Sequence, residues 1–355
     1  MSAGAGTRGG GGIARARWLV ASAPAVAVLA ALGAGAIVIA AIGEDPLAIY
    51  ALLFQQAFGT GYGVGQTLFR ATPLVFGGLA VALAFRAGLF NIGGEGQMLL
   101  GGLAAALVGA YAPLPALLLL PAALLAAAAA GGAWGAIPGA LKAGFGSHEV
   151  INTIMLNFIA LSLVSWLGHG LFETATVRTR EIAAAAVLPR LDAWLPALRG
   201  APVNAALLLA LALAGAIALL LWRTRLGYEL RAVGLNAAAA EYGGIAIGRT
   251  QTLAMALSGA VAGLGGVNFV LGYKHYFELG FTGGAGFMGI AVALLGRNSP
   301  AGVIVAALLF GALAYGGLVV NQRVPRELIE VLEALVILFA ISARALLERA
   351  ARRWA

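Results

Sequence analysis

The sequence predicts an all-α polytopic membrane protein with about ten transmembrane helices. Its 355 residues are 61% hydrophobic and only 10% charged, whereas soluble domains carry about 25% charged residues. The charges bracket apolar runs, several of which exceed the roughly 20 residues that a helix needs to cross a bilayer. The chain has no cysteine, which excludes disulfides and thiolate metal sites.

Ten apolar segments are interpreted as spans. The first follows Arg15 and Arg17 as in a signal peptide, but it reaches Ile42, so it is predicted to be an uncleaved helix. Pro113, Pro115 and Pro121 indicate the turn between the third and fourth spans. The predicted spans are residues 18–42, 65–86, 96–111, 115–141, 150–169, 203–222, 251–272, 284–296, 301–320 and 328–346.

The distribution of basic residues predicts that both termini are cytoplasmic. With an inside N-terminus, most of the 22 Lys and Arg residues fall on the inner side, as the positive-inside rule requires. Residues 1–17 are then a disordered cytoplasmic tail, 18–346 the transmembrane domain and 347–355 a second cytoplasmic tail. The net charge of +8 is explained by inner loops better than by a nucleic-acid partner.

Two large loops lie on opposite sides of the predicted membrane domain. Residues 170–202 are extracytoplasmic and mixed in charge, which suits either a solvated cap or the docking of a soluble partner. Residues 223–250 are cytoplasmic. They contain a helix-forming stretch, Ala237–Tyr242, with Asn236 as its N-cap and Gly243-Gly244 as its stop. This short helix is predicted to fit a groove on a cytoplasmic partner; the alternative is an interfacial amphipathic helix.

The segment Phe90–Gln97, FNIGGEGQ, is the first candidate for a solute path. Its glycines disfavour regular helix, and broken backbone with polar side chains at membrane depth is typical of transport proteins. The alternative is that the side chains satisfy backbone groups freed by the break. Since the segment follows Arg86, Glu95 is expected near an inner gate. The candidates are Asn91, Glu95 and Gln97.

The start of the fifth span is the second candidate for the path. Glu149, Thr153 and Asn157 are four residues apart and share one helix face, and Asn152 lies on a neighbouring strip. An amide-bearing face suits a neutral polar solute, although hydrogen bonding between helices explains it equally well. Asn268, at the end of the seventh span, is a weaker candidate for the outer mouth.

Two patterns concern how the helices pack. A second glycine-rich break at Leu279–Gly296 precedes a span of opposite direction, which predicts an inverted repeat with the first break. Glycines four apart, at Gly131, Gly135 and Gly139 or at Gly259 and Gly263, predict close helix–helix packing.

Several motifs are missing from the sequence. There is no GxxxxGK[ST] phosphate loop, so the chain does not bind ATP in that way, and there is no HExxH or GxSxG. The chain is therefore not expected to be an enzyme; an intramembrane enzyme using Glu95 and His148 is the weakest hypothesis. No aspartate lies in mid-span, which disfavours a secondary transporter driven by an ion gradient.

Four blocks together resemble the permeases of bacterial ABC importers for nucleosides and simple sugars, in the superfamily of ribose and branched-chain amino-acid permeases. They are FNIGGEGQMLLGG, HEVINTIMLNFIA, LRAVGLNAAAAEYGGI and GAGFMGIAVALLGRNSPAG. The resemblance implies a type II importer fold in the bacterial inner membrane. It also implies a second permease subunit, identical or distinct, a cytoplasmic ABC ATPase and an extracytoplasmic substrate-binding lipoprotein.

The same resemblance implies a solute and a coupling segment. The solute is a nucleoside, with ribose-like sugars and branched-chain amino acids as alternatives. The chain itself needs no cofactor, because ATP and magnesium belong to the ATPase. Residues 231–248 match the family's coupling segment, although Ala-Ala-Glu-Tyr-Gly-Gly replaces its Glu-Ala-Ala order. Its candidate contact residues are Arg231, Gly234, Asn236, Glu241, Gly243 and Gly244.

Overall fold

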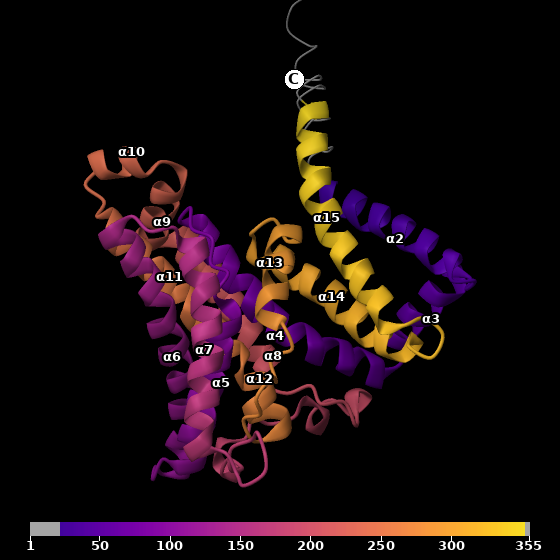
Figure 1. The fold of residues 1–355 in the computed structure, drawn as a ribbon, viewed down its shortest axis with the longest axis horizontal. Coiled ribbons are helices and arrows are strands. Elements are labelled where there is room, and N and C mark those ends of the chain that lie inside the picture. The colour runs from indigo at the N-terminus through magenta and orange to yellow at the C-terminus, as the bar shows by residue number, and fades with distance from the viewer. Residues whose placement is uncertain (1–21, 352–355) are drawn as a thin grey trace, which may run out of the picture. The chain divides into compact units, whose positions relative to one another are not determined.

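The computed structural model describes residues 22–351, which are almost entirely helical (Figure 1). Within this part of the chain, β structure is limited to three isolated bridges. The tail predicted at 1–17 lies outside the described residues. At the other end, helix α15 (Arg326–Ala351) continues five residues beyond the predicted end of the membrane domain at 346.

The described residues form two compact units, 22–56 with 316–351, and 57–315. In the first unit, α2 (Ala23–Ala41) packs against α15, and α3 (Pro46–Phe58) lies mostly in this unit. The hydroxyl of Tyr50 on α3 donates to the Leu32 carbonyl oxygen at 2.7 Å, which ties α3 to α2. The sequence did not predict α3.

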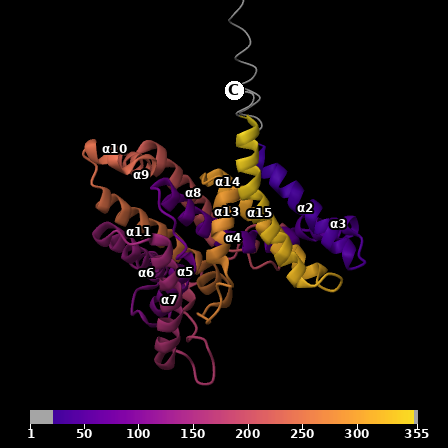
Figure 2. The ribbon, with the colours of Figure 1, turned by 45° about the horizontal axis from the view of Figure 1, so that its top comes forward.

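The second unit is a bundle with α4 (Gly61–Arg86) at its centre. This helix buries most of its side chains and contacts α8, α11 and α13. Figure 2 shows α9 and α10 together at the end of α8 and the start of α11. The other helices of this unit are α5 (Gly94–Tyr111), α6 (Ala116–Phe145), α7 (Glu149–Leu171), α8 (Ala206–Arg223), α9 (Arg225–Leu235), α10 (Ala237–Tyr242), α11 (Ile247–Gly265), α12 (Val267–Phe269), the π-helix η4 (Val270–Lys274), α13 (Ala285–Leu295) and α14 (Pro300–Val320), which ends in the first unit.

A seam of glycines joins α6 to α11, as predicted. A Cβ added at Gly131 would overlap the Gly259 carbonyl oxygen, and one at Gly139 would lie 2.8 Å from the Cα of Thr252. Because small residues let the two backbones approach closely, the helices gain van der Waals packing, which is one of the main sources of helix association in lipid. The glycines at 131, 135, 139, 259 and 263 therefore have a packing role.

The prediction of a multi-pass membrane protein is confirmed, but ten spans are not. Seven helices in residues 22–351 are long and apolar enough to cross a membrane. The predicted third span corresponds to α5, which is not among the seven. The predicted eighth span corresponds to α13, whose 11 residues extend only about 16 Å. The predicted tenth span corresponds to α15, which is not among the seven.

Two local predictions were wrong. Pro121 lies inside α6, so the turn after α5 is Ala112–Pro115 alone. Gly94 and Gly96 lie inside the first turn of α5, so the break comes earlier, at 87–93. Glycine is tolerated there because neighbouring side chains take up the backbone groups at the helix start, as described next.

Candidate transport path and coupling surface

Asn91 is the centre of a buried polar network in the break between α4 and α5. Its side-chain amide donates to Gln97 Oε1 at 2.9 Å and to Ser258 Oγ at 2.8 Å. Its Oδ1 accepts from the Gly93 backbone N–H at 2.9 Å and from Gln97 Nε2 at 3.2 Å. Ser258 in turn donates to the Ala80 carbonyl oxygen at 2.7 Å. One amide thus connects the break with α4, α5 and α11.

The polar face of α7 completes this network. Asn157 accepts from the Gly96 N–H at 2.9 Å and donates to the Ile92 carbonyl oxygen at 2.9 Å. Thr153 Oγ1 accepts from the Ile92 N–H at 3.3 Å. Helix starts leave backbone N–H groups without intrahelical partners, and these side chains supply the partners. Glu149, on the same buried face, is paired with Lys142 at 2.6 Å.

Glu95 links the two glycine breaks. Its carboxylate accepts from the Gly284 N–H at 3.2 Å and the Gly286 N–H at 2.9 Å, and so caps the start of α13. A negative charge at a helix N-terminus is favourable. Contacts of Gly94 with Gly286 and of Gly102 with Phe281 show that the two segments run antiparallel. This agrees with the opposite directions that the sequence indicated, while the inverted repeat stays a prediction.

The position of Glu95 along α4 follows from its contacts. The adjacent Ala285–Gly286 segment lies beside Gly77 of α4. Gly77 is nine residues from the end of α4 at Arg86, or about 13 Å along the helix. Glu95 therefore lies nearer the middle of α4 than its C-terminal end, and its place near an inner gate stays a prediction.

Asn268 has a packing role in this conformation. Pro73 inside α4 has no N–H, so the carbonyl oxygen of Phe69 loses its helical partner. Asn268 Nδ2 donates to that oxygen at 3.2 Å, and Asn268 Oδ1 accepts from Asn204 at 3.1 Å. The side chain is buried. It therefore bonds to the carbonyl group that the proline leaves without a helical partner, and its contact with a solute at an outer mouth stays a prediction.

The structure brings together some of the predicted path residues and separates others. Asn91, Gln97, Thr153 and Asn157 form one buried network, with Glu95 beside it and partly exposed. Asn152 lies apart and donates to Ser147 Oγ at 2.6 Å. Because the network bonds to the protein itself, its contact with a solute stays a prediction.

A cluster of exposed and partly exposed polar side chains on the N-terminal half of α4 was not predicted from the sequence. Arg70 lies 5.9 Å from the Tyr315 ring centroid, and Tyr62 meets the same ring edge-on at 6.4 Å. Gln66 Nε2 donates to the Tyr62 hydroxyl at 2.8 Å. The signal was available, since Tyr62, Gln66 and Arg70 are four residues apart within one apolar helix.

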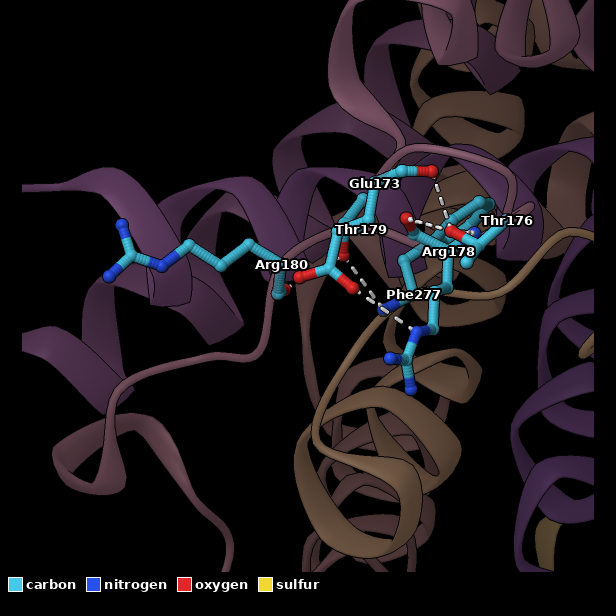
Figure 3. A network of polar contacts seen from close by, with 6 residues as sticks. All are labelled: Glu173, Thr176, Arg178, Thr179, Arg180 and Phe277. Carbon is cyan, nitrogen blue, oxygen red and sulfur yellow. Dashed lines mark hydrogen bonds and ion pairs between the residues drawn. The ribbon is translucent and has the colours of Figure 1, made fainter.

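The segment between α7 and α8 is an ordered cap. Thr179 N–H donates to the Phe277 carbonyl oxygen at 2.9 Å, and Phe277 N–H returns to Thr179 Oγ1 at 3.1 Å (Figure 3). Arg178 pairs with Glu173 at 3.3 Å in the same network. A hydrogen bond with the Tyr276 side chain raises the pKa of Arg178, so its guanidinium stays charged. The cap is thus attached to the segment that follows η4.

The predicted helix in the loop between α8 and α11 is confirmed as α10. Asn236 Oδ1 accepts from the Ala239 N–H at 3.0 Å, and Gly244 after the helix has φ of +79°. Helices α9 and α10 line a groove of about 350 Å³ that includes Arg231, Asn236 and Gly243. Glu241 is exposed beside it.

An arginine–tryptophan stack holds this groove to the bundle. Arg231 and Arg86 lie 4.5 Å and 5.4 Å from the Trp222 ring centroid, within the range of cation–π attraction. Gly234 approaches the Arg86 carbonyl so closely that a side chain there would overlap it. Around the groove, Leu235 is 88% and Tyr242 96% exposed. The α9–α10 groove is thus held in place by contacts with α4 and α8 and is surrounded by exposed apolar side chains. Such a surface is suited to binding a partner protein.

The apolar helices, the polar network at a helix break and the exposed α9–α10 surface define a membrane transport subunit. The chain belongs to the family described as branched-chain amino acid transport system / permease component, whose model matches residues 63–341.

Three relatives match most of the chain. The guanosine ABC transporter permease protein of Bacillus subtilis is 41% identical over 91% of this chain and 93% of its own length. The glucose ABC transporter permease protein of Haloferax volcanii is 39% identical over 92% and 88%. The nucleoside ABC transporter permease protein of Lactococcus lactis is 37% identical over 89% of each. No solved structure matches the chain.

Proposed function

We propose that this chain is the transmembrane permease subunit of an ABC importer for nucleosides. The α9–α10 surface is the observation that carries the proposal. It offers exposed apolar side chains around a groove, fixed to α4 and α8 through Trp222, in a chain without a nucleotide-binding loop of its own. The similarity to guanosine and nucleoside permeases supports the solute class.

The transport cycle is proposed to be alternating access driven by partners. A cytoplasmic ABC ATPase holds ATP and magnesium and hydrolyses ATP, and it contacts Arg231, Asn236, Glu241 and Gly243-Gly244. An extracytoplasmic lipoprotein delivers the nucleoside, and the cap between α7 and α8 is its docking surface. A second permease subunit, identical or distinct, completes the path. The complex resides in the bacterial inner membrane with both termini of this chain in the cytoplasm.

Uptake into proteoliposomes tests the proposal. The chain is purified with a second permease, ATPase and lipoprotein encoded beside it, and labelled guanosine uptake is measured with and without ATP. Uptake that requires ATP and lipoprotein is expected. Uptake by this chain alone under an ion gradient would instead establish a secondary transporter. Labelled glucose and leucine serve as competing solutes, since the Haloferax relative is named for glucose.

A glycine variant tests the coupling surface separately. At Gly244, φ of +79° strains any side chain, although space is open around it. Gly244→Val is expected to distort the end of α10 and to lower ATPase stimulation by loaded lipoprotein at least about tenfold. Gly144→Val is the matched control, because Gly144 lies in the last turn of α6 with open space around it and no positive φ. Equal ATPase stimulation in the two variants would show that the turn at Gly244 has no role in coupling.

A further inference from the structure

One side chain links the C-terminal end of α4 to two other parts of the second unit. Arg86 donates to the Asn298 carbonyl oxygen from Nη2 at 2.9 Å and from Nε at 3.3 Å. Its guanidinium also lies over the Trp222 ring, which it shares with Arg231 of α9. A guanidinium can do both, because its N–H donors spread along its edge while its charge is attracted by the ring. Arg86 therefore connects the α9–α10 surface with the turn that follows α13.

The turn after α13 has a backbone conformation that needs support from its surroundings. Arg297 and Asn298 have φ of +56° and +51°, in the left-handed region that disfavours residues other than glycine. Such conformations persist where neighbouring groups hold them. The Asn298 N–H donates to the Ala293 carbonyl oxygen of α13 at 2.8 Å, while the Asn298 carbonyl oxygen accepts from Arg86. The turn is thus tied to α13 on one side and to Arg86 on the other.

Helix α13 is held at both ends by side chains from other helices. Glu95 of α5 accepts from the Gly286 N–H at its start, and Arg86 of α4 holds the turn at its end. With 11 residues, α13 is shorter than the roughly 20 residues that cross a bilayer. Its position therefore depends on the elements to which it is bound, and the bond to Glu95 places its start beside the candidate path.

We propose that Arg86 is a positioning residue for transport, which couples the ATPase-facing helix α9 to α13. This deepens the proposed function and rests on it. The chain of contacts from Arg231 through Trp222 and Arg86 to Asn298 is called the relay. When the ATPase displaces α9, Arg231 moves the ring, Arg86 follows the ring because cation–π attraction is short-ranged, and its two bonds to Asn298 shift the turn after α13.

Loss of coupling with retained ATP hydrolysis is the first expected result. In the full transporter, Arg86→Ala is expected to lower the stimulation of ATP hydrolysis by nucleoside-loaded lipoprotein about fivefold or more, the usual range of coupling between sites. The basal rate of hydrolysis should stay unchanged. Arg86→Lys keeps the charge and a donor, so it should restore part of the stimulation. Arg223→Ala is the matched control, because it removes an exposed arginine beside Trp222 in sequence and should leave stimulation unchanged.

Trp222 allows the relay to be broken at a more exposed position, where folding is less at risk. This residue is 52% exposed. Trp222→Leu stays apolar but loses the aromatic face, so stimulation should fall about threefold, as expected for an exposed cation–π pair. Trp222→Phe restores a ring face and should recover most of it. Combining Trp222→Leu with Arg86→Ala should cost no more than Arg86→Ala alone, because both changes break one relay.

A thiol reporter on α13 measures the relay without measuring transport. Because the chain has no cysteine, Phe287→Cys, at an exposed position in the first turn of α13, is its sole thiol. Maleimide labelling of this thiol in the reconstituted complex should differ in rate between the nucleotide-free and ATP–vanadate states. Arg86→Ala should abolish that difference. Phe145→Cys, at the exposed end of α6, is the control whose labelling Arg86→Ala should leave unchanged.

The outcomes separate the two proposals. A wild-type complex that takes up no nucleoside with ATP overturns the proposed function. ATP-driven uptake in the wild type with undiminished stimulation in Arg86→Ala overturns the relay alone. If Arg86→Ala does not assemble, undiminished stimulation in Trp222→Leu overturns the relay instead. A Phe287→Cys reporter that ignores nucleotide in a transporting complex, or keeps its nucleotide dependence in Arg86→Ala, also overturns it.

Discussion

The polar network at the glycine break and the polar cluster on the N-terminal half of α4 differ in how far the protein encloses their side chains. Asn91, Gln97 and Asn157 are buried and bond to backbone or to each other. Tyr62, Gln66 and Arg70 are exposed or partly exposed; Gln66 donates to the Tyr62 hydroxyl, and Arg70 lies over the Tyr315 ring. Burial together with the number of hydrogen bonds therefore distinguishes the structural amides of the network from the amide of Gln66.

The largest loss of stability is expected at Asn91. If it is not observed, the buried network does not have the structural role that distinguishes it from the cluster on α4. Asn91→Leu removes four hydrogen bonds, each worth about 0.6 kcal/mol in a membrane protein. A loss of about 2 kcal/mol in unfolding free energy is expected. Denaturation of the detergent-solubilised protein measures it, and an unchanged midpoint would show that the network is not structural.

Asn268 should show the same behaviour to a smaller degree. Asn268→Leu leaves the Phe69 carbonyl beside Pro73 without its donor and removes an acceptor from Asn204. A destabilisation of about 1 kcal/mol is expected from these two bonds. The double variant Asn204→Leu with Asn268→Leu should lose less than the sum of the single changes. Strict additivity would contradict their coupling.

Glu95 lies between the two categories, being partly exposed yet bonded to backbone. Glu95→Gln keeps the size but has one acceptor oxygen in place of two, so one of the Gly284 and Gly286 bonds is lost. A loss of about 0.5–1 kcal/mol is expected, since the charge at the α13 N-terminus also disappears. Unfolding curves measure this loss. Comparing Glu95→Gln with Glu95→Asp, which retains the charge, separates the contribution of the charge from that of the hydrogen bonds.

The smallest effect on stability is expected at Gln66. Gln66→Leu removes one bond to Tyr62 on a partly exposed face, and such changes usually stay within about 0.5 kcal/mol. Denaturation of the detergent-solubilised protein measures it. A loss as large as that expected for Asn91→Leu would place Gln66 with the structural amides.

Features of the fold that depend on neighbours in sequence were predictable, and features that depend on distant partners were not. The cap of α10 lies within nine residues, Asn236 to Gly244, and the glycine seam follows a four-residue period on each helix. The bond of Glu95 to Gly286 joins residues 191 apart, and that of Asn268 to Phe69 joins residues 199 apart. No local pattern encodes those partners, so a solute-facing and a structural amide look alike in sequence.

Pro73 also has a mechanical consequence. The C-terminal arm of α4, from Pro73 to Arg86, is about 20 Å long, and its end shares the Trp222 ring with Arg231 of α9. Helices commonly kink at a proline, and a change of about 10° in such a kink would move this end of α4 by about 3 Å. Pro73 therefore separates the arm of α4 that contacts α9 from the arm that bears Tyr62 and Arg70.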